Sequence, residues 1–133
     1  MRRKDYLFFA VSALVLAGGL TAMKLIKDPW QVPANYKTMK NKVAVSKTSL
    51  AEGKELFDMA CASCHGTTGK AKIAKGIDLF DLSSADFHAK FTDGEIYYQS
   101  FVGRNPWHNF TKAVPDETDR WNVVNYIRSL KGK

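Results

Sequence analysis

The fold is decided by the stretch Cys61-Ala62-Ser63-Cys64-His65-Gly66. It contains both cysteines of the chain, three positions apart, and a histidine directly after the second one. At this spacing the two thiols lie on one side of a helical turn, next to the imidazole. The chain has 133 residues, enough for one small domain and an appendage, and small domains bury a modest share of their surface. Something besides apolar burial is therefore expected to hold the domain together.

Cys-x-x-Cys-His is the pattern of covalent haem attachment. The thiols of Cys61 and Cys64 can each form a thioether with a haem vinyl group, and the imidazole of His65 then lies under the iron as its proximal ligand. We therefore expect one covalently bound haem c, with its iron, held by these three residues. The haem would also supply apolar core that the short sequence lacks.

Three other readings of the same residues are weaker. A thioredoxin-like redox pair needs a neighbouring βαβ pattern, which this sequence does not show. A zinc site needs four ligands, and outside the motif only His88 and His108 remain. A structural disulfide leaves the adjacent His65 without a role. Haem attachment is the favoured interpretation.

Three capped segments predict three helices. Capping boxes open the first two, Ser49-Leu50-Ala51-Glu52 and Thr92-Asp93-Gly94-Glu95, and the third helix follows Pro115-Asp116. No stretch shows two-residue alternation bounded by hairpin signals. The expected fold class is all-α, with the domain beginning at Ser49.

From Ser49 to Leu130 the chain resembles the class I monohaem cytochromes c. The resemblance is carried by Gly53 and Phe57, by CASCHG at 61–66 and by DRWNVVNYIRSL at 119–130. It implies the small cytochrome c fold, with three main helices around one haem. It also implies that the first and last helices cross, with Gly53 allowing their close approach.

The chain departs from this family at the sixth iron ligand, usually a methionine in the loop before the last helix. All four methionines precede the haem motif: Met1, Met23, Met39 and Met59. The expected loop instead carries His108, and imidazole is a good iron ligand. We expect His65 and His108 to bind the iron. Met39, if the preceding segment folds over the haem, and an open sixth position are the alternatives, whereas His88 is expected to be a surface histidine.

A second departure concerns the partner of the proximal histidine. The family usually presents a proline carbonyl to the other ring nitrogen of that residue. Here the corresponding stretch is Gly76-Ile77-Asp78-Leu79, and we expect the carbonyl of Ile77 to take this role.

The N-terminal segment is expected to cross a membrane. Residues 6–23 carry no charge and would span roughly 27 Å as a helix. We therefore expect a transmembrane anchor with basic flanks at 1–27, an extended linker at 28–48 and the haem domain at 49–133. A signal peptide cleaved near Val15-Leu16-Ala17 is the alternative.

The net charge of +7 lies entirely in the N-terminal third. There are nine basic and two acidic residues before Ser49, and eleven of each from Ser49 onward. The basic cluster Arg2-Arg3-Lys4 predicts a cytoplasmic N-terminus and a haem domain on the periplasmic side of a bacterial inner membrane. The neutral domain offers no basic surface for nucleic acid.

These features predict an electron carrier rather than an enzyme. An iron with both axial positions filled has none open for a small-molecule substrate, so only an electron passes. Its partners would be redox proteins, as a subunit or close partner of a respiratory or photosynthetic membrane complex. The alternative is a gas-binding or sensory haem domain with an open sixth position, although the sequence shows no signalling module.

Overall fold

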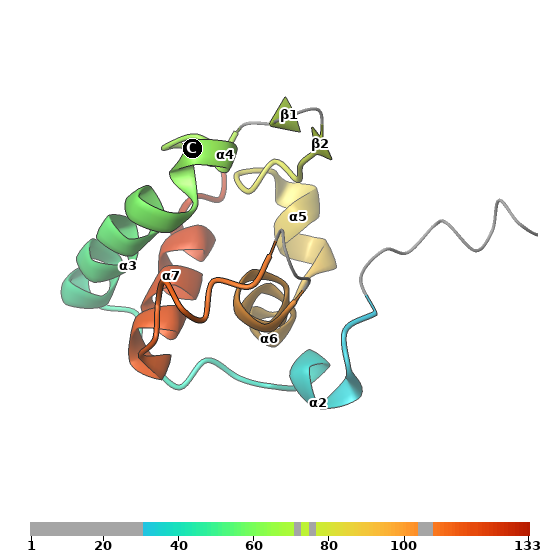
Figure 1. Ribbon diagram of the computed structural model, residues 1–133, viewed down its shortest axis with the longest axis vertical. Helices are drawn as coiled ribbons and strands as arrows, with labels where there is room; N and C mark the ends of the chain where they lie inside the picture. The colour runs from blue at the N-terminus through green and yellow to red at the C-terminus, as the bar shows by residue number, and fades with distance from the viewer. Residues whose placement is uncertain (1–30, 71–72, 75–76, 104–107) are drawn as a thin grey trace, which may run out of the picture. The chain divides into compact units, whose positions relative to one another are not determined.

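The computed structural model describes residues 31–70, 73–74, 77–103 and 108–133 (Figure 1). Its helices are α2 (Ala34–Lys37), α3 (Lys47–Ala60), α4 (Ala62–His65), α5 (Ala85–Lys90), α6 (Asp93–Tyr97) and α7 (Glu117–Ser129), and a π-helical turn, η1 (Tyr98–Val102), continues α6. Two-residue strands β1 (Ile73–Ala74) and β2 (Ile77–Asp78) pair antiparallel. The described part is mostly helical, as the sequence predicts, and departs from an all-α fold only in this small hairpin.

Residues 32–133 form one compact unit. The predicted anchor at 1–27 lies outside the described residues. In the part of the chain that the structure describes, no helix is both long enough and apolar enough to cross a bilayer.

The centre of the domain is the crossing of α3 with α7, which lie side by side in Figure 1. A Cβ at Gly53 would stand 2.0 Å from the carbonyl oxygen of Asn122, so only glycine lets these two backbones approach. The predicted role of Gly53 is confirmed. Phe57 is fully buried, and its ring centroid lies 5.3 Å from that of Tyr126. A tilted aromatic pair of this kind adds about 1 kcal/mol to the gain from apolar burial.

Helix α7 is buried along most of its length. All residues from Trp121 to Ile127 are buried, because α3 covers one part of the helix and α6 contacts another. The Trp121 ring lies 4.4 Å from that of Tyr97 in α6. Burying each large apolar side chain contributes about 2–3 kcal/mol. The same core takes in residues from the segments before α7: Leu82, Phe87, Ile96, Phe101 and Val114.

The helix starts agree with the sequence at two of three places. The Thr92–Glu95 capping box is present. The side chain of Asp116 caps α7 by accepting hydrogen bonds from backbone N–H groups in its first turn. The box predicted at Ser49 is wrong: α3 begins earlier, with Ser46 as its N-cap and Ser49 as the reciprocal partner. Serine can take the place of glutamate here because its hydroxyl also accepts a backbone N–H. The side chain of Glu52 instead accepts from Asn122 at 2.8 Å.

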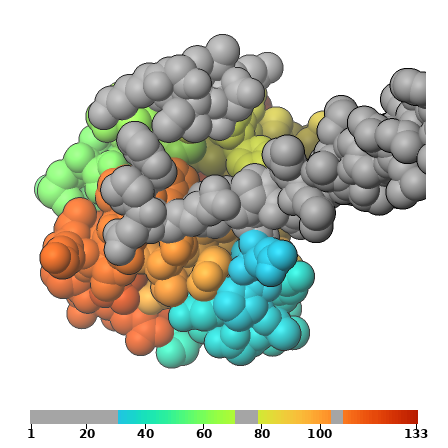
Figure 2. Space-filling view, turned by 45° about the vertical axis from the view of Figure 1, so that its right-hand side comes forward, coloured from blue at the N-terminus to red at the C-terminus, as the bar shows by residue number. Residues whose placement is uncertain are grey.

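The described part of the segment that the sequence assigns to an extended linker, residues 28–48, is folded onto the domain. Figure 2 shows it in cyan against the orange elements, and α2 contacts α6. The ring of Tyr36 lies 4.8 Å from that of Tyr98. Asn41 Nδ2 donates to Asn125 Oδ1 at 2.8 Å and to the Trp121 carbonyl at 3.3 Å. Single side chains make these contacts, so the segment has no periodic pattern that would reveal them.

Candidate functional site

The Cys-x-x-Cys-His motif lies where α3 ends and α4 begins. Cys61 closes α3 through its N–H, which donates to the Phe57 carbonyl at 2.8 Å. The N–H groups of Cys64 and His65 donate back to the Cys61 carbonyl at 3.1 and 3.0 Å. Gly66, with φ of 73°, then turns the chain away. The turn from Cys61 to His65 therefore carries both thiols and the imidazole on one short stretch of backbone.

The two cysteines are free thiols, so the disulfide alternative is not formed. Burial, with a smaller contribution from Cys64, raises the pKa of Cys61 to about 12. A redox-active pair of the thioredoxin kind needs a lowered thiol pKa, and Cys61 shows the opposite shift. In the described residues, no group of three or more histidine, cysteine or acidic side chains is placed to hold a metal ion. The structure thus gives no support to the redox-pair and zinc alternatives.

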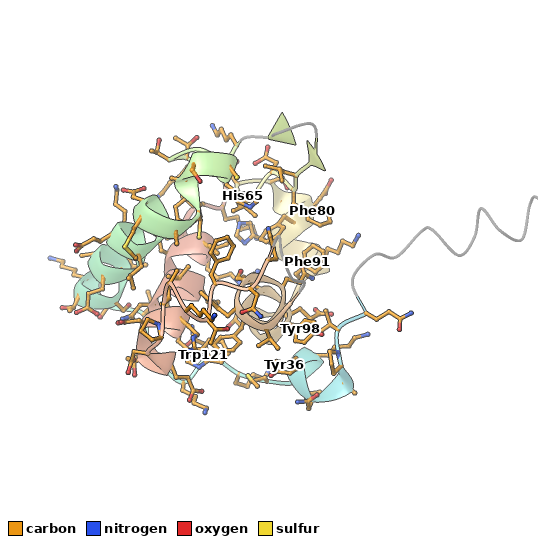
Figure 3. The ribbon with its side chains drawn as sticks, viewed as in Figure 1. Tyr36, His65, Phe80, Phe91, Tyr98 and Trp121 are labelled. Atoms are coloured by element: carbon orange, nitrogen blue, oxygen red, sulfur yellow. The ribbon has the colours of Figure 1, made fainter. Side chains whose placement is uncertain are left out.

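His65 and His108 come from different elements and lie close together. The centroids of their rings are 6.0 Å apart, with an angle of 60° between the planes. Figure 3 shows His65 below α4, toward the interior of the domain. Two metal–nitrogen bonds of about 2.0 Å, with about 1 Å from each nitrogen to its ring centre, separate two imidazole centroids by about 6 Å. The observed separation therefore suits two imidazoles that share one metal ion.

The pKa values of both histidines are lowered, which favours the neutral form that binds metals. Burial, followed by the neighbouring His108, lowers the pKa of His65 to about 4. Burial also lowers the pKa of His108, an effect that its hydrogen bond to Gln99 opposes. In that bond His108 Nδ1 donates to the Gln99 carbonyl at 3.0 Å. Because a carbonyl can only accept, the proton is on Nδ1 and the lone pair on Nε2, the arrangement typical of a ligating histidine.

Nδ1 of His65 is buried and has no partner among the described residues, which is also true of Gln99 Nε2, Asp58 Oδ1 and Asn122 Oδ1. The predicted bond from His65 to the carbonyl of Ile77 is not formed. Ile77 instead pairs with Ala74 in the small hairpin. Buried polar atoms are seldom left unpaired, and the polypeptide leaves this histidine nitrogen without a partner.

The remaining histidine and methionine candidates are occupied elsewhere. His88 Nε2 lies 2.9 Å from the Leu82 carbonyl, and its Nδ1 lies 3.3 Å from Arg128 Nη1. Both nitrogens of His88 are therefore engaged by the protein, as expected for a histidine that is not a ligand. Met39 packs against Gly94 at the start of α6. The structure brings His108, and not His88, to His65.

Sequence reasoning missed the part that Gln99 plays at this site. Gln99 contributes its backbone carbonyl to His108. A contact made by the main chain leaves no signal in residue types. Only the path of the helix and the loop shows it.

Comparison with known proteins supports the haem-attachment motif. The family model for cytochrome c matches residues 50–131, which is more than half of the chain. A search of curated proteins gave no match. The family binds covalently attached haem c, and Cys61, Cys64 and His65 fit its attachment motif. With the helical fold, the motif and this match in agreement, the chain belongs to the cytochrome c family.

Proposed function

We propose that this electron-transfer haem protein binds its iron between the imidazoles of His65 and His108. The observation that carries the proposal is the 6.0 Å separation of the two ring centroids. The tautomer of His108 supports it, because the bond from Nδ1 to Gln99 leaves the lone pair on Nε2.

Each residue of the site has a defined task. Cys61 and Cys64 would attach the haem to the turn between α3 and α4, and His65 and His108 would bind its iron. Bound haem supplies a one-electron iron couple. With both axial positions taken by the protein, no position remains for a substrate, and the chemistry is limited to electron transfer. Imidazole in place of thioether sulfur favours ferric iron and so a lower potential than a His/Met pair gives.

The proposal extends to the membrane. Residues 1–27 form a single-pass anchor in a bacterial inner membrane, with the N-terminus cytoplasmic and the haem domain periplasmic. The uncharged run at 6–23 and the basic cluster before it support this arrangement. The tether raises the effective concentration of the domain near its partner, a membrane oxidoreductase complex of a respiratory or photosynthetic chain.

The test is CO binding to the reduced full chain in mild detergent. Wild-type protein should bind CO slowly or not at all, because CO must displace His108. His108→Ala should open the iron and bind CO rapidly, with a high-spin spectrum. His88→Ala is the matched control, since it removes a histidine whose nitrogens both meet the protein, and it should leave the spectrum unchanged.

Two results would contradict this ligation. The first is rapid CO binding by the wild-type protein, which would favour a gas-binding domain with an open position. The second is a His108→Ala spectrum identical to that of the wild type, which would return Met39 as the candidate ligand.

A further inference from the structure

The helix before the His108 loop ends in a widened turn. In an α-helix the N–H of Gly103 would bond the carbonyl of Gln99. In η1 it bonds the carbonyl of Tyr98 instead, one residue further back, at 2.7 Å. The carbonyl of Gln99 is thereby released from the helix, and it accepts the Nδ1–H of His108 at 3.0 Å. Single π-turns of this kind are frequent at functional sites.

The same loop binds the next two carbonyls of η1. Ser100 accepts the backbone N–H of Phe110 at 3.2 Å. The Phe101 carbonyl accepts from the hydroxyl of Thr111 at 2.5 Å, and the same hydroxyl lies 2.9 Å from Oδ1 of Asn109 within the loop. Three consecutive carbonyls at the end of η1 are therefore taken by groups of the His108 loop.

This arrangement solves two physical problems at once. The last carbonyls of a helix have no partners within it and must be satisfied from outside. A ligating imidazole, for its part, needs its ring orientation and tautomer fixed by a bond from its second nitrogen. The π-turn puts the unused carbonyls beside the loop, which supplies two side chains, His108 and Thr111, and one backbone N–H, that of Phe110. Of these three hydrogen bonds to η1, two are made by side chains of the loop: those of His108 and Thr111.

We propose that Thr111 is a positioning residue for His108: its hydroxyl fastens the loop to the end of η1 and so keeps the imidazole at the iron. The inference rests on the proposed function, in which His108 is an axial ligand. It goes beyond that function by assigning the positioning of the His108 ring to a residue that is not itself an iron ligand.

The experiment uses the full chain with haem attached, in mild detergent. It measures the rate of CO binding to the reduced protein, which is limited by departure of His108 from the iron. Thr111→Val keeps the branched shape and removes the hydroxyl. We expect CO binding to become roughly fivefold faster, the effect of one lost hydrogen bond. Thr111→Ser keeps the hydroxyl and should restore the wild-type rate.

Thr38→Val is the matched control. Its hydroxyl also meets carbonyls at a helix end, those of Ala34 and Asn35 at 3.5 and 3.4 Å, but in α2. It should bind CO at the wild-type rate. This separates the hold on His108 from a general loss of stability.

The outcomes distinguish the two proposals. If Thr111→Val binds CO no faster than Thr38→Val while His108→Ala binds it rapidly, His108 is the ligand and the positioning role is overturned. If the wild-type protein already binds CO as fast as His108→Ala, the ligation itself fails. Should Thr111→Val yield no folded haem protein, Thr111→Ala removes the same hydroxyl with less bulk, and its comparison with Thr111→Ser decides the question.

Discussion

His88 and His108 are the same residue type, but their surroundings differ. His88 is held between the Leu82 carbonyl and the guanidinium of Arg128. His108 uses Nδ1 for a backbone carbonyl, and its ring lies 6.0 Å from that of His65. A histidine becomes a ligand when one nitrogen is fixed by the protein and the other carries a lone pair toward the metal. Among the described residues, His108 has its Nδ1 fixed by a backbone carbonyl and its ring close to that of His65.

Gly53 is the residue on which the helix crossing depends most directly. Gly53→Ala puts a Cβ 2.0 Å from the backbone oxygen of Asn122, which cannot turn aside as a flexible side chain would. We expect the free energy of unfolding to fall by about 1–3 kcal/mol, the usual cost of overpacking. Urea denaturation of the haem-loaded protein measures this loss.

Gly132 provides a control for Gly53→Ala. A Cβ at Gly132 would have no atom within 4 Å, although the residue has φ of 76°. Gly132→Ala should therefore cost only backbone strain, about 1 kcal/mol or less at this chain end. Equal losses for the two variants would contradict a packing role for Gly53.

At the scale of the elements, α5 and α7 are joined by a cluster of charged and titratable groups. Arg128 of α7 donates to Asp93 at 2.7 Å and to the Phe91 carbonyl at 2.7 Å, and it reaches His88 of α5. Burial lowers the pKa of His88 below its usual 6.5, its hydrogen bond to Leu82 opposes this shift, and the charges of Arg128 and Lys131 lower it further. The folded protein therefore favours neutral His88.

This preference predicts a dependence of stability on pH. Because the folded pKa of His88 is depressed, its contribution is fully present above the unfolded value of 6.5 and is lost as the pH falls through the folded value. The urea midpoint should drop between about pH 7.5 and about pH 5.5. His88→Gln, whose amide can still donate to Leu82, should show a smaller drop. An unchanged pH dependence in this variant would show that His88 does not contribute.

For the whole molecule, the segment before α3 is part of the fold. Its residues meet α6 through Tyr36 and the α7 backbone through Asn41. Thr92 donates its hydroxyl to the Lys37 carbonyl at 3.1 Å, a further link between this segment and the start of α6. The compact unit that includes the haem motif therefore begins at Val32. A chain that starts at Ser46 would lack the contacts made by residues 32–45.

Two truncations test this extension. A chain that starts at residue 31 and is exported by an added cleavable signal peptide should be released from membranes. It should keep the haem spectrum and thermal stability of the full chain. A chain that starts at Ser46 keeps the capped α3 but uncovers Asn125, which is 4% exposed and bonded to Asn41. Each hydrogen bond lost with the segment contributes about 0.5–1.5 kcal/mol, so the melting temperature of this shorter chain should be lower by several degrees. Equal melting temperatures would show that residues 32–45 add nothing to the fold.

The sequence by itself determined the features whose signal is local or covalent. The haem motif needs only the spacing of Cys61, Cys64 and His65, and the caps at Thr92 and Asp116 need only a polar side chain at a helix start. Local signals fail where two residues serve equally well, which is why the start of α3 was predicted at Ser49 and is found with Ser46 as the cap.

Only the tertiary structure decided which groups meet across the chain. His65 and His108 are 43 positions apart, and Asn41 meets Asn125 across 84. No residue pattern encodes the π-turn that releases the carbonyl of Gln99 to His108. Such contacts depend on how helices pack once the chain has closed on itself, and backbone carbonyls carry no identity in the sequence. The attachment of haem could thus be predicted from the sequence, while the residue set beside its proximal histidine follows from packing alone.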